Sequence, residues 1–258
     1  MSVALSADGN TAIVGGWSDN SKTGAAWVFT RNGGVWTQQG KKLVGSDAVG
    51  SARQGMSVAL SADGNTAIVG GPGDNPWARH APFGLGASGA AWVFTRGGGV
   101  WTQQNKLVST GAVGRLGTSV ALSADGNIAI VGGFAEDGGV ALVFTRTGDQ
   151  WAQAKKLIGT GAVGKSAPSV ALSADSRVVM LGASNDNGGV GAAWVFTRIG
   201  DYWTQDKNLV GSGVAAKAAP SASVDSNIVI VDRSNQTVFT QELARPSALS
   251  SPGVNFEE

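Results

Sequence analysis

Hydrophobic residues alternate with small or polar ones along short stretches of this chain, with the period of two that marks a β-strand. Residues 2–6 (SVALS) alternate valine and leucine with smaller residues. In residues 25–31 (AAWVFTR), tryptophan and phenylalanine fall on one face and the central valine on the other. No stretch places apolar residues three and four apart over several turns, as an amphipathic helix would. The pattern therefore predicts an all-β chain.

Four such strands form a unit that repeats along the chain. The stretch SVALSADGNTAIVGG supplies the first two strands, and it stands at residues 2–16, again without change at 57–71, and in diverging forms at 119–133, 169–183 and 221–231. Each of the first four copies is followed by a stretch like GAAWVFTRNGGVWTQQ, which supplies two more strands. The Asp-Gly pair between the first two strands predicts a type I′ hairpin.

This organisation predicts a β-propeller. The repeats start between 50 and 62 residues apart, and four consecutive antiparallel strands per unit are typical of a propeller blade. A four-stranded sheet cannot bury both faces alone, so its neighbours supply the core. We expect a single domain over residues 1–258 with five blades, of which the fifth is degenerate. The approximate blade boundaries are 2–56, 57–118, 119–168, 169–220 and 221–246, followed by a tail at 247–258.

The two ends of the predicted ring do not match. In the fifth repeat, Phe239 matches the phenylalanine of the third strand, but no tryptophan follows to mark a fourth strand. The first repeat begins at its inner strand, so the N-terminus does not supply the missing one. Either the tail after Ala244 supplies a short strand, or the ring closes by side-chain packing alone, or chains associate. An unpaired strand edge invites association, and self-association through the fifth blade is therefore a further hypothesis.

Composition narrows the classes of function. The formal net charge of +1 provides no basic surface for nucleic acid, and the absence of cysteine excludes disulfides, thiolate zinc sites and cysteine nucleophiles. We expect no membrane insertion, because no run of about 18 apolar residues is present. No signal peptide is visible, and the abrupt start in a strand suggests a fragment of a longer protein. The 40 glycines among 258 residues fit many tight turns.

The sequence offers little for catalysis or metal binding. His80 is the only histidine, it lies in a long polar insertion, and we expect no catalytic residues. Each first hairpin carries one carboxylate and one amide, which falls short of the roughly six to eight oxygens that calcium takes. The hairpin acids are therefore interpreted as turn residues: Asp8, Asp63, Asp125 and Asp175. We expect no metal site and no cofactor; calcium is allowed but not expected.

Binding residues are expected in the loops between the second and third strands. In an antiparallel blade these loops lie at the same end as the connections to the next blade, and they differ in length between repeats. Exposed aromatic and arginine side chains dominate binding hot spots; the alternative is that Trp17 and Trp77 pack over the strand ends. The candidate ligand-binding residues are Trp17, Asp19, Asn20, Asp74, Asn75, Trp77, Arg79, His80, Asp137 and Asp186.

The repeated motifs resemble the FG-GAP repeat of bacterial proteins, a family related to the propeller of integrin α subunits. The resemblance rests on SVAL-S-x-DGN-TAIVGG, GAAWVFTR and W-T-Q-Q-x-KL, and it covers four full copies and one partial copy. The Phe-Gly of the family is replaced, for example by Gln54-Gly55, and the calcium loop of integrin blades is shortened to residues 7–10. The family implies an extracellular or cell-surface protein that binds a ligand or partner.

We therefore expect a non-enzymatic repeat scaffold for ligand or protein binding or adhesion, within a larger surface or secreted protein. The expected partner is an unidentified protein or glycan, and no nucleic acid. The alternative is a carbohydrate-binding lectin with one pocket per blade, against which the unequal loops count. An enzyme with a site in the central funnel ranks third, because His80 stands alone and cysteine is absent.

Overall fold

The structure is a computed structural model, and it describes residues 1–76, 87–135, 138–162, 168–184, 186, 190–210, 221–224, 228–231 and 237–241. For Gly138 and for the three segments after residue 220, only the backbone is described. The strands form five sheets, and in each sheet consecutive strands pair with one another. Every pairing between these strands is antiparallel, for example β1 with β2 (Ser2–Leu5 with Thr11–Gly16). The predicted all-β class is confirmed.

The strands have the following bounds. Sheet 1 contains β1 (Ser2–Leu5), β2 (Thr11–Gly16), β3 (Ala25–Asn32) and β4 (Val35–Gln38). Sheet 2 contains β5 (Ser57–Leu60), β6 (Thr66–Gly71), β7 (Ala90–Gly97) and β8 (Val100–Leu107). Sheet 3 contains β9 (Gly114–Leu122), β10 (Ile128–Ala135), β11 (Gly138–Thr147) and β12 (Gln150–Ile158). Sheet 4 contains β13 (Pro168–Leu172), β14 (Val178–Ala183), β15 (Ala192–Ile199) and β16 (Tyr202–Leu209), and sheet 5 contains β17 (Ser221–Val224), β18 (Ile228–Val231) and β19 (Thr237–Gln241).

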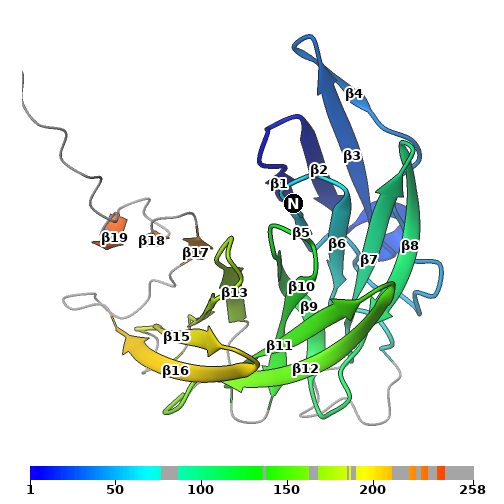
Figure 1. Ribbon diagram of the computed structural model, residues 1–258. Coiled ribbons are helices and arrows are strands. Elements are labelled where there is room, and N and C mark those ends of the chain that lie inside the picture. The colour runs from blue at the N-terminus through cyan, green and yellow to red at the C-terminus, as the bar shows by residue number, and fades with distance from the viewer. Residues whose placement is uncertain are drawn as a thin grey trace, which may run out of the picture.

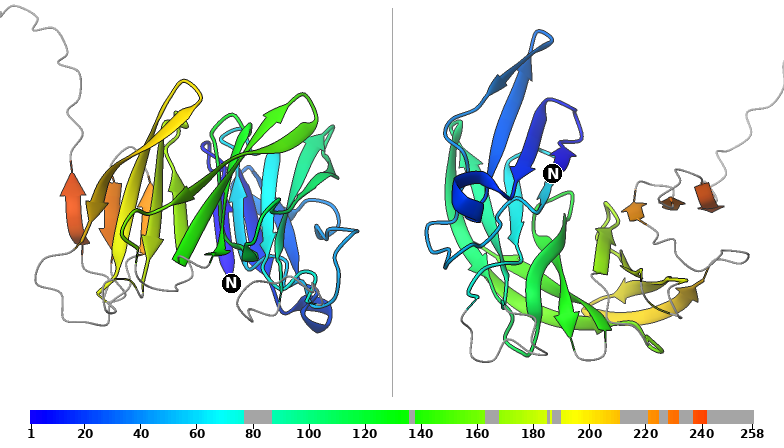
Figure 2. Two further views of the ribbon diagram at one scale, coloured as in Figure 1. Left: turned by 90° about the horizontal axis from the view of Figure 1, so that it is seen from below. Right: turned by 180° about the vertical axis from the view of Figure 1, so that it is seen from behind.

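The sheets follow one another around an arc, with their first strands on the inside (Figure 1). β1 lies beside β5, β5 beside β9, β9 beside β13, and β13 beside β17. Sheet 1 and sheet 5 stand at opposite ends of the arc, which is seen most clearly from behind (Figure 2). A linker leads from the outer, fourth strand of one sheet back to the inner, first strand of the next.

The hydrophobic core lies between successive sheets. Between sheets 1 and 2, Ile13 and Val28 on one side pack with Val69, Trp92 and Phe94 on the other. Equivalent clusters join sheet 2 to sheet 3 and sheet 3 to sheet 4. Because side chains alternate across a strand, sheets 2 and 3 each give one face to the cluster before them and the other to the cluster after them. The prediction that neighbouring units supply the core is confirmed.

Close backbone contacts explain a pair of glycines at the junction of sheets 1 and 2 and another at the junction of sheets 2 and 3. The linker that enters sheet 2 crosses the end of sheet 1 at Gly55, which has φ +79. A Cβ added at Gly55 would lie 2.2 Å from the carbonyl oxygen of Ala25, and one added at Gly15 would lie 2.2 Å from the carbonyl oxygen of Gly55. Gln54, which replaces the phenylalanine of the FG-GAP motif, is fully buried. Its Oε1 accepts a hydrogen bond of 2.6 Å from the backbone N–H of Gly45.

The first hairpin is not the type I′ turn that the sequence predicts. In sheet 1 the N–H of Gly9 donates to the carbonyl of Ser6 at 2.9 Å. Gly9 has φ 65, but Asp8 is outside the left-handed region. A type I′ turn needs positive φ at two successive residues. The prediction was wrong because the serine and aspartate side chains stabilise a turn that needs only one left-handed glycine.

The tryptophans that recur in the repeats occupy two different environments. On the third strands, Trp92 and Trp194 are buried, with 0% and 1% exposure. Trp27 holds the same position in sheet 1 but is only half-buried, because no sheet of the described chain covers its face. On the fourth strands, Trp36 is 41% exposed, whereas Trp101, Trp151 and Trp203 are partly buried.

Candidate functional site

Each sheet has two ends with different surroundings. At one end, which we call the loop end, the connection between the second and third strands lies beside a linker, as where Asn75 N–H donates to the carbonyl of Val49 at 3.0 Å. At the other end, the hairpin end, the first hairpin meets the end of the third strand, as where Arg31 N–H donates to the carbonyl of Asn10 at 2.8 Å. The prediction that the variable loops share an end with the linkers is confirmed.

The hairpin end carries one hydrogen-bond network that repeats from sheet to sheet. The Ser6 hydroxyl donates to the Asp8 carboxylate at 2.5 Å, and this carboxylate also accepts from the backbone N–H (2.9 Å) and the side-chain amide (3.1 Å) of Asn10. The same contacts recur in Ser61, Asp63 and Asn65 and in Ser123, Asp125 and Asn127. These carboxylates serve the turn, which confirms their interpretation as turn residues.

The same contacts set the pKa of the hairpin carboxyls. The hydrogen bond from Ser6 and those from Asn10 hold the pKa of Asp8 below its usual value. At Asp63, partial burial alone would raise the pKa, but the bonds from Ser61 and Asn65 outweigh it and the pKa is again lowered. Hydrogen bonding to the charged form is therefore the cause that these sites share.

In sheets 1 to 3, the arginine at the end of the third strand donates to the hairpin asparagine and stacks on a tryptophan. Arg31 Nε donates to Asn10 Oδ1 at 3.2 Å, and its guanidinium lies 5.5 Å from the centre of the Trp36 ring. Sheets 2 and 3 repeat both contacts. In sheet 4, Arg177 replaces the asparagine and cannot accept, and Arg198 binds the carbonyl of Gly200 instead.

At the loop end, Asp74 ties three segments together. The side chain of Asp74 is 2% exposed, and its Oδ2 lies 2.8 Å from Lys106 Nζ on β8. Its Oδ1 accepts a hydrogen bond of 2.7 Å from the backbone N–H of Val49 in the preceding linker. The Lys106 ammonium also donates to the carbonyl of Asp47 (2.8 Å) and lies 5.3 Å from the centre of the Trp92 ring. Both charges of this pair are therefore fully engaged in holding the loop, the linker and the sheet together.

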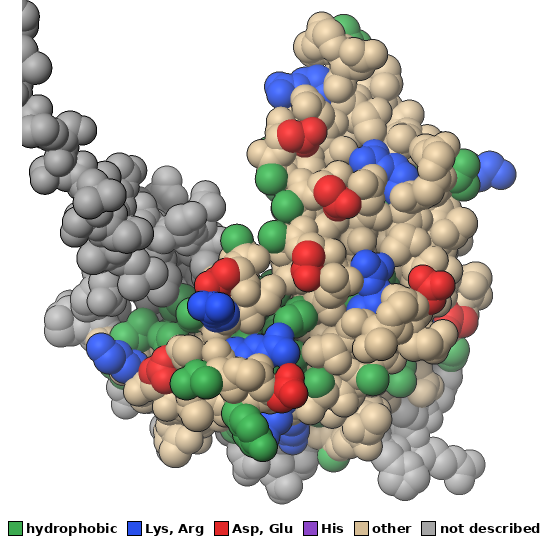
Figure 3. All heavy atoms as spheres, in the orientation of Figure 1, with side chains coloured by type: hydrophobic (Ala, Val, Ile, Leu, Met, Phe, Trp, Pro, Cys, Tyr) green, Lys and Arg blue, Asp and Glu red, His purple; other side chains and the backbone are tan. Residues whose placement is uncertain are grey.

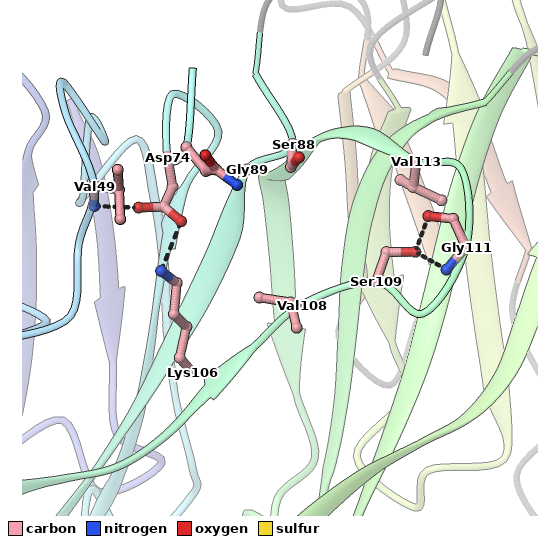
Figure 4. A pocket seen from close by; sticks show the side chains of 10 residues that line it. Val49, Asp74, Ser88, Gly89, Lys106, Val108, Ser109, Gly111 and Val113 are labelled. Atoms are coloured by element: carbon pink, nitrogen blue, oxygen red, sulfur yellow. Dashed lines mark hydrogen bonds and ion pairs between the residues drawn. The ribbon is translucent and has the colours of Figure 1, made fainter. Parts of the chain in front are cut away.

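A pocket of about 510 Å³ opens next to this ion pair (Figure 4). Its wall comes from two successive linkers, from the loop between β6 and β7, and from the end of β8. The residues that line it are Val49, Asp74, Asn75, Ser88, Gly89, Lys106, Val108, Ser109, Gly111 and Val113. The pocket thus lies between sheets 2 and 3, among segments that differ in sequence from one repeat to the next.

The pocket offers both apolar and polar contacts. Val49 and Val108 are 44% and 50% exposed, so their side chains are accessible to a ligand. The Asn75 side chain is exposed, and its backbone is held in the left-handed region with φ 49. Ser109 Oγ donates to the carbonyl of Gly111 at 3.0 Å, which shapes the opposite wall. Such a wall suits a small amphipathic ligand or a side chain from a protein loop.

The structure separates the predicted binding residues. Asp74 and Asn75 line the pocket, whereas Asp19 forms an ion pair with Lys42 in sheet 1. Asp186 is buried, and its carbonyl accepts from Gly191 N–H at 2.9 Å. Two of the remaining candidates, Trp17 and Asn20, lie at the loop end of sheet 1. The other four lie outside the described residues: Trp77, Arg79, His80 and Asp137.

Trp17 and Asn20 belong to the loop that follows β2. The guanidinium of Arg53, in the linker, lies 6.0 Å from the centre of the Trp17 ring, so the ring is held beside the linker and part of it is exposed. Asn20 is exposed and has φ 46 within the short irregular turn α1 (Asp19–Lys22). Neither residue lines the pocket between sheets 2 and 3.

Sequence reasoning missed Lys106, Val108 and Ser109 as pocket residues. They follow the repeated W-T-Q-Q motif, which was interpreted only as an outer strand. The sequence does contain a signal for this contact. In repeats 1 and 2, an acidic residue in the loop between the second and third strands occurs together with a lysine shortly after the W-T-Q-Q motif, and the two form an ion pair, as Asp19 does with Lys42. That pairing predicts contact between the loop and the strand.

Within the described part of the chain, no group of three or more histidine, cysteine, aspartate or glutamate residues is placed to hold a metal ion. Among the described residues, no helix has the length and apolar character needed to cross a membrane.

Comparison with known proteins gives a match to a sequence family over part of the chain and likenesses to solved structures. The FG-GAP repeat family matches residues 36–94, from β4 of sheet 1 through most of β7 of sheet 2. The crystal structure of TolB from Acinetobacter baumannii aligns with 92% of this chain and 52% of its own, at 10% identity and a TM-score of 0.46. The chain therefore spans about half the length of that protein. No curated protein matches the sequence. The FG-GAP resemblance is confirmed for residues 36–94.

Proposed function

We propose that this FG-GAP repeat chain is a non-enzymatic scaffold that binds a ligand or partner at the loop end of its sheets. The five sequence repeats support five β-propeller blades in this chain, one for each sheet. The partner is a protein or a glycan, and the setting that the FG-GAP resemblance suggests is adhesion by a surface or secreted protein. Fold alone does not name the ligand.

The observation that carries this proposal is the pocket between sheets 2 and 3. The hairpin end is occupied by repeated internal hydrogen bonds, as in Ser6, Asp8 and Asn10. The loop end instead joins non-repeated segments around a pocket of about 510 Å³ with exposed valine and asparagine side chains. Variable loops on a rigid repeated frame are where binding residues commonly lie.

The charges beside the pocket favour binding over catalysis. Lys106 is paired with Asp74 at 2.8 Å and also donates to the carbonyl of Asp47. An ammonium and a carboxylate that neutralise each other are poorly placed to exchange protons with a substrate. They do fix the wall of the pocket, which lowers the entropy lost when a ligand binds.

Binding to a printed glycan array and to an array of purified extracellular proteins tests the proposal. We expect the wild-type chain to bind at least one probe and Val108→Arg to lose that binding, because the new side chain fills the pocket. The control is Ile199→Arg, at a position 71% exposed on β15, which should bind as the wild type does. Equal binding by Val108→Arg and wild type would contradict the assignment of the site.

A further inference from the structure

Sheet 1 leaves one apolar face exposed, although the corresponding face of sheet 2 is buried. We call it the open face, and it consists of Val3, Leu5, Ala12, Val14, Trp27 and Phe29. Val3 and Leu5 are 71% and 62% exposed, whereas Val58 and Leu60 at the same positions of sheet 2 are 7% and 9% exposed. Residues 2–16 and 57–71 have the same sequence. The difference therefore comes from what covers the face. Hydrophobic side chains reach the surface along the inner side of the arc at its sheet 1 end (Figure 3).

The structure shows what covers such a face. In sheet 2 the cover consists of Ile13, Ala26 and Val28 of sheet 1 together with Leu43 and Ala52 of the linker. The cover in sheets 3 and 4 has the same two parts, a preceding sheet and residues of its linker. A sheet alone is therefore only part of the complement.

The linker makes specific contacts with the buried tryptophan. Trp92 Nε1 donates to the Asp47 carboxylate at 2.8 Å, and a Cβ added at Gly45 would lie 2.2 Å from the same nitrogen. In sheet 4, Trp194 Nε1 donates to the carbonyl of Thr160 at 3.1 Å. No described residue accepts a hydrogen bond from the indole N–H of Trp27, and the Lys42 ammonium lies 6.0 Å from the centre of its ring.

One backbone hydrogen bond recurs between successive sheets, and its N–H donor lies in the earlier sheet each time. The N–H of Ala7 donates to the carbonyl of Ala62, and the N–H of Ala62 donates to the carbonyl of Ala124, both at 2.9 Å. At the open end of this series, no described residue donates to the carbonyl of Ala7. The complement of the open face therefore supplies an N–H donor at the hairpin end as well as an apolar surface.

We infer that the open face of sheet 1 is the docking surface for one further four-stranded repeat of this class, joined by its linker to β1. The linker that covers Trp92 leads directly through Gly55 and Met56 into β5. A cover of this kind is thus continuous with the strand that it precedes, which points to a repeat in the same polypeptide. The inference does not depend on the ligand pocket of sheet 2.

The fifth repeat is a poorer complement by sequence. Sheet 1 presents Ala4, Ile13 and Val28 to sheet 2, at paired positions of its first three strands. The same register in sheet 5 holds Ser223, Val229 and Thr240. Two of these three positions in the fifth repeat carry polar residues, whereas all three in the first repeat carry apolar ones.

Hydroxyl-radical footprinting with mass spectrometry tests the inference, with Trp92 as the internal reference. One sample is the 258-residue chain, and the other carries an added copy of residues 1–55 ahead of Met1. This junction reproduces the Gly55-Met56-Ser57 sequence between the first two repeats. The added copy carries Trp27→Phe, so that only the original Trp27 is read. The matched control adds Ile13→Asp and Val28→Asp to the extension, which spoils the covering face.

We expect Trp27 to be oxidised faster than Trp92 in the 258-residue chain, equally at about 1 µM and about 100 µM. In the extended chain its oxidation should fall to the rate of Trp92, and the control extension should give no protection. Protection of Trp27 in the 258-residue chain at both concentrations would show closure by sheet 5, and protection only at the higher one, with a dimer in sedimentation, would show a second copy. Either of these two results would overturn the inference. So would an extension that does not protect Trp27, or a loss of Trp92 protection in the extended chain.

Discussion

The indole nitrogen of Trp92 donates a hydrogen bond of 2.8 Å to the carboxylate of Asp47, which lies 45 residues earlier in the linker between sheets 1 and 2. The same carboxylate accepts from the side-chain amide of Gln103 at 3.0 Å. Burial alone would raise the pKa of Asp47, but these hydrogen bonds outweigh it and hold the pKa below its usual value. The linker is thereby fixed to the sheet that follows it.

Asp47→Ala should destabilise the chain, because the indole of Trp92 and the amide of Gln103 lose their acceptor. A polar group left without a partner on burial costs about 1–3 kcal/mol, and we expect a loss in this range in the free energy of unfolding from a urea titration. The control is Asp201→Ala, at a side chain that is 97% exposed, which should change stability by less than about 0.5 kcal/mol. Equal losses would contradict the role of the linker carboxylate.

Stability should fall at acid pH through the hairpin carboxyls. The pKa of Asp63 is lowered from its reference of 3.8 in the folded chain, so the folded state binds fewer protons than the unfolded state between the two values. The stabilisation is complete above the unfolded pKa and is lost as pH falls through the lowered one. We expect Asp63→Asn to melt below the wild type near neutral pH, and the difference to shrink below about pH 4. A difference that stays constant with pH would show that the carboxylate charge plays no part.

Gly55→Ala should be strongly destabilising. The position has φ +79, and the new Cβ would lie 2.2 Å from the carbonyl oxygen of Ala25. Left-handed strain and overpacking each cost about 1–3 kcal/mol, so the free energy of unfolding should fall by several kcal/mol. Gly97→Ala is the control, because nothing lies within 4 Å of its added Cβ, and it should stay within about 1 kcal/mol of wild type. Similar stabilities for the two variants would refute the close approach of the linker.

Calcium should leave the melting temperature nearly unchanged. The hairpin carboxylates, such as Asp8, already accept from a serine hydroxyl and from an asparagine. A site filled at a hundred times its dissociation constant would add about 2.7 kcal/mol, so calorimetry with calcium and with a chelator distinguishes the cases. A calcium-dependent rise of several degrees would contradict the interpretation of these residues as turn residues.

The sequence predicts the strands and their order well, because the period of two and the repeated motifs are local signals. It also indicates which face of the third strand is buried, because the tryptophan and the phenylalanine lie on the same face of that strand. It does not predict that Trp27 differs from Trp92, because burial depends on the neighbouring sheet and not on the identical motif around each ring. The sequence does not predict the pocket for the same reason. Val49, Asn75 and Ser109 come together only when two linkers and a loop lie side by side in the folded chain.

The sequence also does not predict the turn type of the first hairpin. A single Asp-Gly pair is compatible with more than one turn, and the choice here follows from the Ser6 hydroxyl, which both donates to Asp8 and accepts from Thr11 N–H at 2.9 Å. Such a side-chain network has no periodic signature. Repetition of the whole S-x-D-x-N pattern in the first three hairpins is the feature from which it could have been inferred.

The core forms between successive sheets, and the most direct test of this arrangement compares Trp92→Ala with Trp27→Ala. Both residues occupy the same position of the identical octapeptide GAAWVFTR, but Trp92 is 0% exposed and Trp27 is half-buried on a face with no covering sheet. Removing a large buried aromatic costs about 3–5 kcal/mol. Urea titration of the two variants should therefore show a loss of that size for Trp92→Ala and less than half of it for Trp27→Ala. Equal losses would mean that each sheet buries its tryptophan by itself, and would contradict the account.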